Sequence, residues 1–107
     1  MLKTDPIKLG IEQNYFEDII RIVHSYPEIK QLVVFGSRVR GDFGRYSDID
    51  LCVTKKNDGF KITKFRMDLE DLNIPYLIDV VDNSEAEEEL REKIAKEGCI
   101  IWEFSGG

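Results

Sequence analysis

Two apolar strand patterns and the polar loop between them constrain the fold of this chain most strongly. Gln31 to Phe35 is typical of a buried strand, and Asp48 to Thr54 alternates polar with apolar residues as a second strand does. Gly36-Ser37 follows the first strand directly, and residues 41–47 have the composition of a loop. The pattern therefore predicts a sheet in which a glycine-serine turn and a pair of aspartates lie at the ends of strands.

The two aspartates are the first candidate functional residues. Asp48 and Asp50 are separated by one residue, so their side chains lie on one face of an extended strand while Ile49 and Leu51 lie on the other. Two neighbouring carboxylates repel each other, and a purely structural sheet gains nothing from them unless a cation neutralises them. Carboxylate oxygens, completed by phosphate and water, are the ligands that suit Mg²⁺. The pair therefore predicts a magnesium site.

The residues after the first strand favour a phosphate. Gly36 allows the backbone to approach closely, the Ser37 hydroxyl can donate a hydrogen bond, and Arg38 and Arg40 add positive charge. The net charge of −6 argues against a broad nucleic-acid surface, yet three of the six arginines lie between residues 36 and 51. Positive charge is thus concentrated where a phosphate would bind.

A third carboxylate lies in a further predicted strand, residues 76–82. Alternation alone does not choose between Asp79 and Asp82, which lie on opposite faces. Asp82 precedes a predicted helix in which Ser84 and Glu87 have the spacing of a capping box, so Asp82 has a role in a turn or cap. Asp79 has no such role and would need a cation if it is buried. We therefore expect Asp79 to complete the metal site.

The remaining pattern predicts an α/β (α+β) fold, a small mixed sheet of about four strands packed with helices. A chain of 107 residues fits a single domain, here residues 11–104, with an N-terminal arm at 1–10 and a flexible C-terminus at 105–107. We expect Asp58 to cap the helix predicted at 62–72, and Lys55 and Lys56 to be solvated. The predicted helices are 11–26, a short one to Arg40, 62–72 and 85–97, and the last strand is 99–104.

The positions of the two cysteines and the hydropathy of the chain predict its cellular compartment. Cys52 and Cys99 lie in separate apolar runs without metal-ligand spacing, which is typical of buried free thiols in a reducing environment. We find neither a signal peptide nor an apolar segment of membrane length, so the sequence predicts a cytoplasmic protein without a membrane partner.

Together these residues resemble a known superfamily. Gly36-Ser37, ten intervening residues and then Asp48-Ile49-Asp50 are similar to the signature of the DNA polymerase beta nucleotidyltransferases. Gly-Ser-Arg-Val-Arg-Gly followed by Ser-Asp-Ile-Asp-Leu resembles the minimal nucleotidyltransferases within it. These are small one-domain proteins, usually encoded beside a helical HEPN-type protein, and several are antitoxins. The resemblance covers about residues 14–102 and implies the nucleotidyltransferase fold.

The resemblance also implies a reaction. A hydroxyl would attack the α-phosphorus of a nucleoside triphosphate, with ATP the expected donor, and pyrophosphate would leave. Two Mg²⁺ ions would be held by the three aspartates, and Asp79 would accept the proton of the hydroxyl directly or through water. Gly36 and Ser37 would grip the triphosphate, and Arg38 with Arg40 would neutralise its charge.

The chain has no additional domain to hold an acceptor, so the acceptor or its holder should be another protein in a hetero-oligomer. By family analogy this partner is a HEPN-type helical-bundle RNase toxin that receives AMP on a tyrosine. The alternatives are a non-catalytic binding antitoxin, a small-molecule nucleotidyltransferase of the antibiotic-modifying type that uses a partner's pocket, and a purely structural module. The sequence leaves open the base preference and any role of Asp42, Arg45 or His24.

Overall fold

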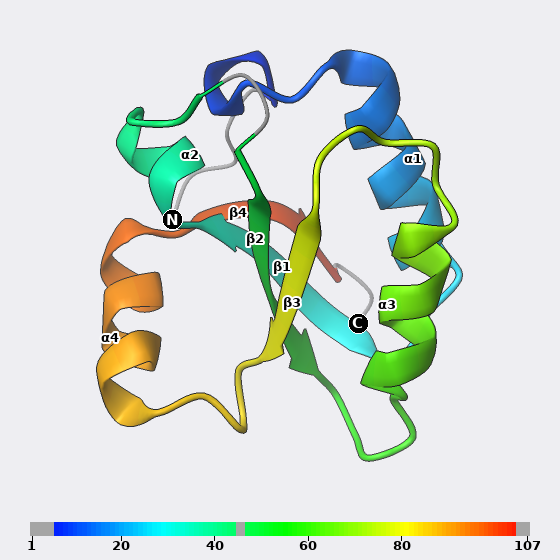
Figure 1. The fold of residues 1–107 in the computed structure, drawn as a ribbon. Coiled ribbons are helices and arrows are strands. Elements are labelled where there is room, and N and C mark those ends of the chain that lie inside the picture. Colours follow the sequence, from blue (N-terminus) through cyan, green and yellow to red (C-terminus); the bar gives the residue numbers. More distant parts are fainter. Residues whose placement is uncertain (1–5, 45–46, 105–107) are drawn as a thin grey trace.

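The computed structural model describes residues 6–44 and 47–104 (Figure 1). Four helices and four strands follow a short 3₁₀ turn, as the sequence predicted apart from some boundaries. In chain order the elements are η1 (Pro6–Leu9), α1 (Gln13–His24), β1 (Ile29–Phe35), α2 (Ser37–Arg40), β2 (Ile49–Lys55), α3 (Ile62–Glu70), β3 (Ile78–Asp82), α4 (Glu88–Glu97) and β4 (Cys99–Glu103).

The four strands form one mixed sheet in the order β3-β2-β1-β4. Strand β1 is antiparallel to β2 and β4, and β2 is parallel to β3. A parallel pair needs a crossover connection, and α3 supplies it between β2 and β3. The predicted mixed sheet packed with helices is confirmed, with β3 at one edge.

Helices cover the two faces of the sheet unequally (Figure 1). Ile49, Leu51 and Val53 of β2 belong to the larger core cluster, which also contains the buried residues of α1 and α3. Cys52 faces the other way, into a smaller cluster with Ile94 of α4. The predicted alternation of β2 is therefore confirmed, and the thinner cover on the α4 side leaves room for a site on that face.

The N-terminal segment contributes to the core where it is described. Leu9 and Ile11 are 2% and 1% exposed and pack in the larger cluster. Part of the predicted arm is thus packed against the domain, whereas residues 1–5 and the predicted flexible end at 105–107 lie outside the described residues. Within the described part of the chain, no helix is long and apolar enough to cross a membrane.

Two predicted N-terminal caps were wrong, one of them together with the start of its helix. Helix α4 begins at Glu88 and not near Glu85, and its N-cap residue is Glu87. Ser84 instead donates its backbone N–H and its hydroxyl to Oδ1 of Asp82, at 2.9 and 2.7 Å, which stabilises a turn before the helix. Lys61, and not Asp58, is the N-cap residue of α3. The capping box is therefore absent, while the turn role of Asp82 is confirmed.

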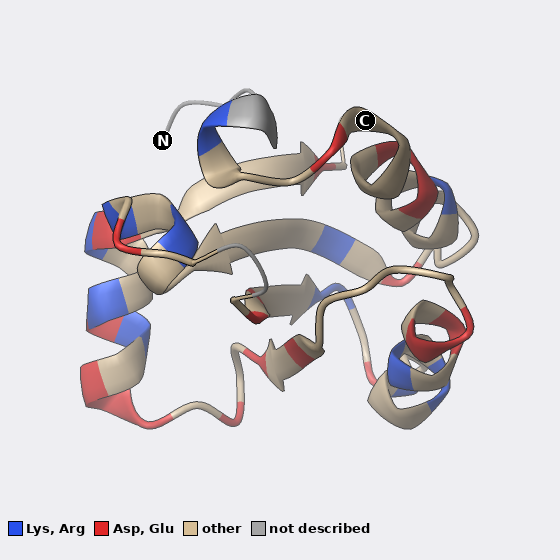
Figure 2. Ribbon diagram, turned by 45° about the horizontal axis from the view of Figure 1, so that its top comes forward, with Lys and Arg blue, Asp and Glu red and all other residues tan. Residues whose placement is uncertain are grey.

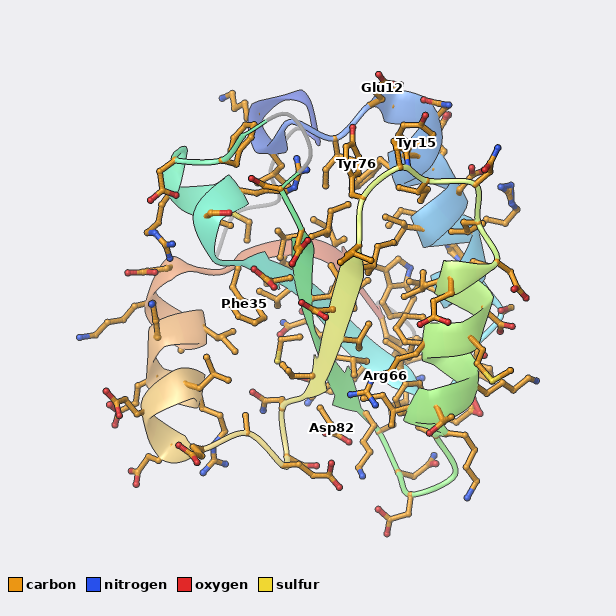
Figure 3. All side chains as sticks on the ribbon, viewed as in Figure 1. Glu12, Tyr15, Phe35, Arg66, Tyr76 and Asp82 are labelled. Carbon is orange, nitrogen blue, oxygen red and sulfur yellow. The ribbon has the colours of Figure 1, made fainter. Side chains whose placement is uncertain are left out.

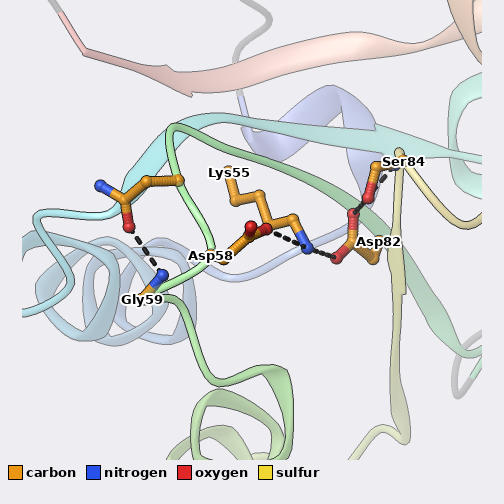
Figure 4. Close-up of polar contacts among 6 residues, drawn as sticks. Lys55, Asp58, Gly59, Asp82 and Ser84 are labelled. Carbon is orange, nitrogen blue, oxygen red and sulfur yellow. Dashed lines mark hydrogen bonds and ion pairs between the residues drawn. The ribbon is translucent and has the colours of Figure 1, made fainter.

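Asp82 and Lys55 form a polar cluster at the end of the sheet where β2 and β3 finish (Figure 4). The Lys55 ammonium lies 3.3 Å from Oδ2 of Asp82 and 3.7 Å from the Asp58 carboxylate, so the expectation that Lys55 is merely solvated was wrong. Burial opposes ionisation of Asp82, but the hydrogen bonds from Ser84 and Lys55 outweigh it and lower the pKa of the Asp82 carboxyl.

Replacing Asp82 with Asn should destabilise the protein by about 1–3 kcal/mol at neutral pH, because charge-assisted hydrogen bonds are lost. The pKa of this carboxyl is lower in the folded state, so its contribution is present above the ordinary carboxyl pKa and is lost as the pH falls through the lowered value. Urea titrations at neutral and acidic pH would measure the difference. Equal destabilisation of variant and wild type on acidification would contradict the assignment.

Candidate active site

The predicted site residues lie at one end of the sheet, on three neighbouring strands. Gly36 follows the last residue of β1, Asp50 is near the start of β2, and Asp79 is near the start of β3. Phe35 is paired with Asp50 across the β1–β2 ladder, and Asp50 is paired with Asp79 across the β2–β3 ladder. Asp48 precedes β2 by one residue. The fold thus brings the glycine turn and the carboxylates together.

Gly36 fits closely against one of these carboxylates. Its φ of +85° is in the region that favours glycine. A Cβ at this position would lie 2.5 Å from Oδ2 of Asp50, well inside van der Waals contact. Both the backbone conformation and the space therefore require glycine where the chain turns from β1 into α2, and the backbone and Asp50 are held against each other.

The electrostatics of Asp50 show that the carboxylates repel one another. Asp50 is half-buried, whereas Asp48 and Asp79 are exposed. Burial, followed by the negative charges of Asp79 and Asp48, raises the pKa of the Asp50 carboxyl, and Arg40 and Arg38 only partly oppose this. A cation placed among the three carboxylates would remove the repulsion. Acidic residues mark β2 and β3 in this region, and basic residues mark α2 (Figure 2).

The donor set fits a hard divalent cation. Asp48, Asp50 and Asp79 offer only oxygen atoms, which Mg²⁺ prefers, and the adjacent strands place their backbones side by side. Among the described residues, no three His, Cys, Asp or Glu side chains already converge as a finished metal centre. Joint coordination of one cation by all three carboxylates would therefore require these side chains to move closer together.

Arg38 does not lie where we expected it. It is only 1% exposed, and its guanidinium donates to main-chain carbonyls on two separate segments. Nη1 donates to the carbonyls of Leu9 and Gly10 at 2.9 and 3.0 Å, while Nη2 and Nε donate to those of Ser47 and Asp48 at 2.5 and 3.3 Å. Because its N–H groups already bind these carbonyls, the guanidinium is not available to a triphosphate. Arg38 therefore has a structural role in place of the phosphate contact that we expected.

Two aromatic rings complete the environment of Arg38. The guanidinium carbon lies 4.6 Å from the ring centre of Tyr76 and 5.3 Å from that of Phe43. Tyr76 in turn meets Tyr15 edge to face with ring centres 5.9 Å apart, and Figure 3 shows these two side chains between α1 and the segment that leads into β3. Burial lowers the pKa of Arg38, although the nearby Tyr76 and aspartates oppose this.

Replacing Arg38 with Lys should destabilise the fold by about 2–4 kcal/mol, because one ammonium cannot serve four carbonyls arranged around a planar fork and an unsatisfied buried group costs about 1–3 kcal/mol. Arg40→Lys is the matched control, since Arg40 is 41% exposed and pairs with Asp42 at 3.5 Å, and it should change stability by less than about 0.5 kcal/mol. Denaturant unfolding measures both, and equal effects would contradict the structural role of Arg38.

Arg40 and the residues whose roles the sequence left open differ in their distance from the site. Arg40 is also 4.0 Å from the Glu97 carboxylate of α4, and it lies at the surface where a phosphate has access. Asp42 is exposed beside it, and Arg45 lies outside the described residues. His24 is exposed and packs edge to face against Trp102 of β4. Since β4 and β3 are opposite edges of the sheet, His24 is remote from the carboxylates.

Comparison with known proteins agrees with this fold. Residues 17–105 match the model of the family described as polymerase beta, nucleotidyltransferase. Because the match covers most of the chain, the protein belongs to the polymerase beta nucleotidyltransferase family.

The chain is also similar to an individual curated protein. The chain is 31% identical over 71 residues to the probable protein adenylyltransferase MntA of Haemophilus influenzae. That alignment covers 64% of this chain and 62% of the relative, so the chain spans less than two thirds of the length of the curated relative it matches.

Solved structures share the fold. A chain in the crystal structure of a toxin-antitoxin with AMP-PNP has a TM-score of 0.69 at 24% identity, covering 84% of this chain and 74% of that one. A chain in the complex of a tri-AMPylated Shewanella oneidensis HEPN toxin with an MNT antitoxin has a TM-score of 0.65 at 21% identity, covering 86% of this chain and 72% of that one.

Proposed function

We propose that this protein is a magnesium-dependent nucleotidyltransferase that transfers AMP from ATP to a tyrosine of a HEPN-type partner toxin and thereby acts as an antitoxin. The observation that carries the proposal is the set of three aspartates, Asp48, Asp50 and Asp79, beside a glycine turn that contacts one of them. A structural module needs neither the repelling carboxylates nor the close glycine. Family membership supports the reaction class.

Different residues of the chain bind the triphosphate, hold the metal ions and position the start of β2. Gly36 and Ser37 bind the triphosphate, and surface-exposed Arg40 attracts it electrostatically. Asp48, Asp50 and Asp79 would hold two Mg²⁺ ions, which when bound stabilise negative charge on the attacking and leaving oxygens. Arg38 acts as a positioning residue, because it binds the Asp48 carbonyl and so holds the start of β2.

The transfer itself is an in-line displacement. The acceptor oxygen forms a bond to the α-phosphorus as the bond from that phosphorus to the oxygen bridging to the β-phosphate breaks, and pyrophosphate leaves. Asp79 takes the hydroxyl proton, directly or through water, because it is the exposed carboxylate on the edge strand, where an acceptor from another protein has access. The acceptor is thus activated at the rim of the sheet.

The partner proposal draws on the relatives. One is named as a probable protein adenylyltransferase, and the similar solved structures include an AMPylated HEPN toxin in complex with an MNT antitoxin. A non-catalytic binding antitoxin remains the alternative that the same relatives would fit. The proposed cytoplasmic location follows the sequence prediction and is a proposal of the same kind.

The reaction class is tested with the purified protein, the proposed HEPN-type partner, Mg²⁺ and ATP labelled on either the α- or the γ-phosphate. We expect label on the partner from α-labelled ATP only, since nucleotidyl transfer releases the γ-phosphate in pyrophosphate. Label from γ-labelled ATP would indicate phosphoryl transfer instead. Label on a small acceptor such as an aminoglycoside, with none on the partner, would favour the small-molecule alternative.

A further inference from the structure

The buried guanidinium of Arg38 joins two parts of the chain that are far apart in sequence. On one side it donates to the carbonyls of Leu9 and Gly10, which end η1 and follow it. On the other side it donates to the carbonyls of Ser47 and Asp48, which lead directly into β2. One side chain therefore holds the N-terminal part of the domain against an aspartate of the proposed metal site (Figure 1).

Asp48 depends on this contact because it lies outside the sheet. The pairing of β2 with β3 begins at Ile49, and the pairing of β2 with β1 reaches only to Asp50. Arg38 instead fixes the peptide groups before and after Asp48, at the carbonyls of Ser47 and of Asp48 itself. The position of the exposed Asp48 carboxylate therefore follows the position of the guanidinium.

Gly10 is packed against both the guanidinium and one of the rings beside it. Its φ is +71°, in the region that favours glycine. A Cβ at this position would lie 3.0 Å from Nη1 of Arg38 and closer still to the edge of the Phe43 ring. That ring centre is itself 5.3 Å from the guanidinium carbon. A side chain at position 10 would therefore push the ring or the guanidinium away from its present contacts.

The other ring at Arg38 connects it to the second strand that carries an aspartate. Tyr76 lies two residues before β3, and its ring centre is 4.6 Å from the guanidinium carbon. The N–H of Ile49 donates to the carbonyl of Leu77 at 2.8 Å, so the residues that lead into β2 and β3 are also bonded to each other. A displaced guanidinium would thus disturb the start of both strands.

We propose that Gly10 is a positioning residue of the active site, which through Arg38 fixes the backbone at Asp48 and thereby the place of that carboxylate. The effect on transfer rests on the proposed function, whereas the coupling between Gly10 and Asp48 does not depend on it. A purely structural glycine would change the stability of the whole domain. A positioning glycine changes the segment around Asp48 by more than the rest of the domain.

Amide hydrogen exchange of Gly10→Ala distinguishes these two roles without any measurement of activity. The amide of Leu51, in a central strand, measures the change for the whole domain. We expect exchange at residues 47–49 to accelerate by a factor about ten times that at Leu51, because the carbonyls around Asp48 lose their donor and this segment opens locally. A factor at 47–49 no larger than that at Leu51 would overturn the inference.

A double variant tests the contact through which Gly10 acts. Leucine at position 43 lacks the outer ring atoms that a methyl group on Gly10 would overlap. The effect of Gly10→Ala on exchange at 47–49 should therefore be smaller when Phe43→Leu is also present. If Gly10→Ala had the same effect with and without the ring, backbone strain at position 10 would explain it, and the proposed path would be contradicted.

The wild-type protein allows a reciprocal test that does not depend on how well a variant folds. If Gly10 and Asp48 are coupled, a ligand bound at Asp48 must also stabilise the segment at Gly10. We expect Mg²⁺ with AMP-PNP to slow amide exchange at Gly10 and Ile11, but not at Phe104 beyond the end of β4. Unchanged exchange at Gly10 and Ile11 in the presence of bound nucleotide would overturn the inference.

Transfer assays relate the coupling to catalysis. Gly10→Ala should lower kcat by about tenfold and raise the Mg²⁺ concentration that gives the half-maximal rate, because a displaced carboxylate holds the metal less well. If wild-type protein transfers no AMP but Gly10→Ala still loosens residues 47–49, the proposed function fails and the coupling stands. If wild-type protein transfers AMP and kcat is unchanged in Gly10→Ala, the proposed function stands and Gly10 is not a positioning residue.

Discussion

Replacing Asp50 with Asn is expected to lower kcat for AMP transfer by at least about 10³-fold, equivalent to about 4 kcal/mol, while the protein remains folded. Asp50 is paired with Asp79 across the parallel strands and touches the Gly36 turn, so its carboxylate is the centre of the proposed metal site. Initial rates of label transfer measure the effect. Asp58→Asn is the control, because Asp58 is fully exposed and its one ion pair among the described residues is with Lys55, and it should retain wild-type activity.

The same substitution should stabilise the metal-free protein. Burial and the neighbouring aspartates raise the pKa of Asp50 in the folded state, so folding without metal becomes less favourable as the pH rises from the ordinary carboxyl pKa through the raised value. Asparagine removes this penalty at neutral pH. We expect Asp50→Asn to have a higher Tm than wild type without Mg²⁺ and to lose the rise in Tm that Mg²⁺ gives the wild type. A variant that is less stable without metal would contradict this account of the site.

Gly36→Ala is expected to lower activity by about 10²-fold, because a displacement of about 1 Å in a catalytic group can have that effect. The added methyl group would lie 2.5 Å from Oδ2 of Asp50, so either the carboxylate or the turn must move. Gly41→Ala is a partly matched control. Gly41 has the same φ of +85° with ψ of 5°, in the left-handed helical region, and no atom lies within 4 Å of an added Cβ, so its alanine variant bears only a backbone strain of about 1–2 kcal/mol. Gly36 has ψ of −152°, in a region that is essentially restricted to glycine, so its alanine variant bears more strain and also displaces Asp50.

The comparison of these two glycines is made at equal folded fraction. Unfolding curves give the loss of stability of each variant, and transfer rates give the difference in activity between them. If Gly41→Ala lost as much activity as Gly36→Ala, backbone strain would explain both, and the contact with Asp50 would have no catalytic meaning.

Much of the fold was predictable because its signals are local. The apolar run ending at Phe35 and the alternation through β2 predicted the strands, and the faces of β2 follow from alternation alone. The positions of Asp48, Asp50 and Asp79 at one end of the sheet follow from strand order and direction. Boundaries were less predictable, as α4 shows: Ser84 satisfied its hydrogen bonds with Asp82 instead of capping the helix.

The role of Arg38 was not predictable, because its partners are backbone carbonyls. Leu9 and Gly10 lie far from Arg38 in sequence, and main-chain carbonyls leave no residue-type signal. An arginine beside a phosphate motif is more readily assigned to the phosphate. The structural role of Arg38 thus depends on contacts between segments that are distant in sequence.

The central claim is tested most directly by intact-mass analysis of both chains after the protein, its proposed HEPN-type partner, ATP and Mg²⁺ are incubated together. The account predicts that the partner gains the mass of one or more AMP units with wild-type protein, and none with Asp48→Asn, although the complex still forms. A partner that is neutralised in a stable complex without any gain in mass would contradict the account and establish a binding antitoxin.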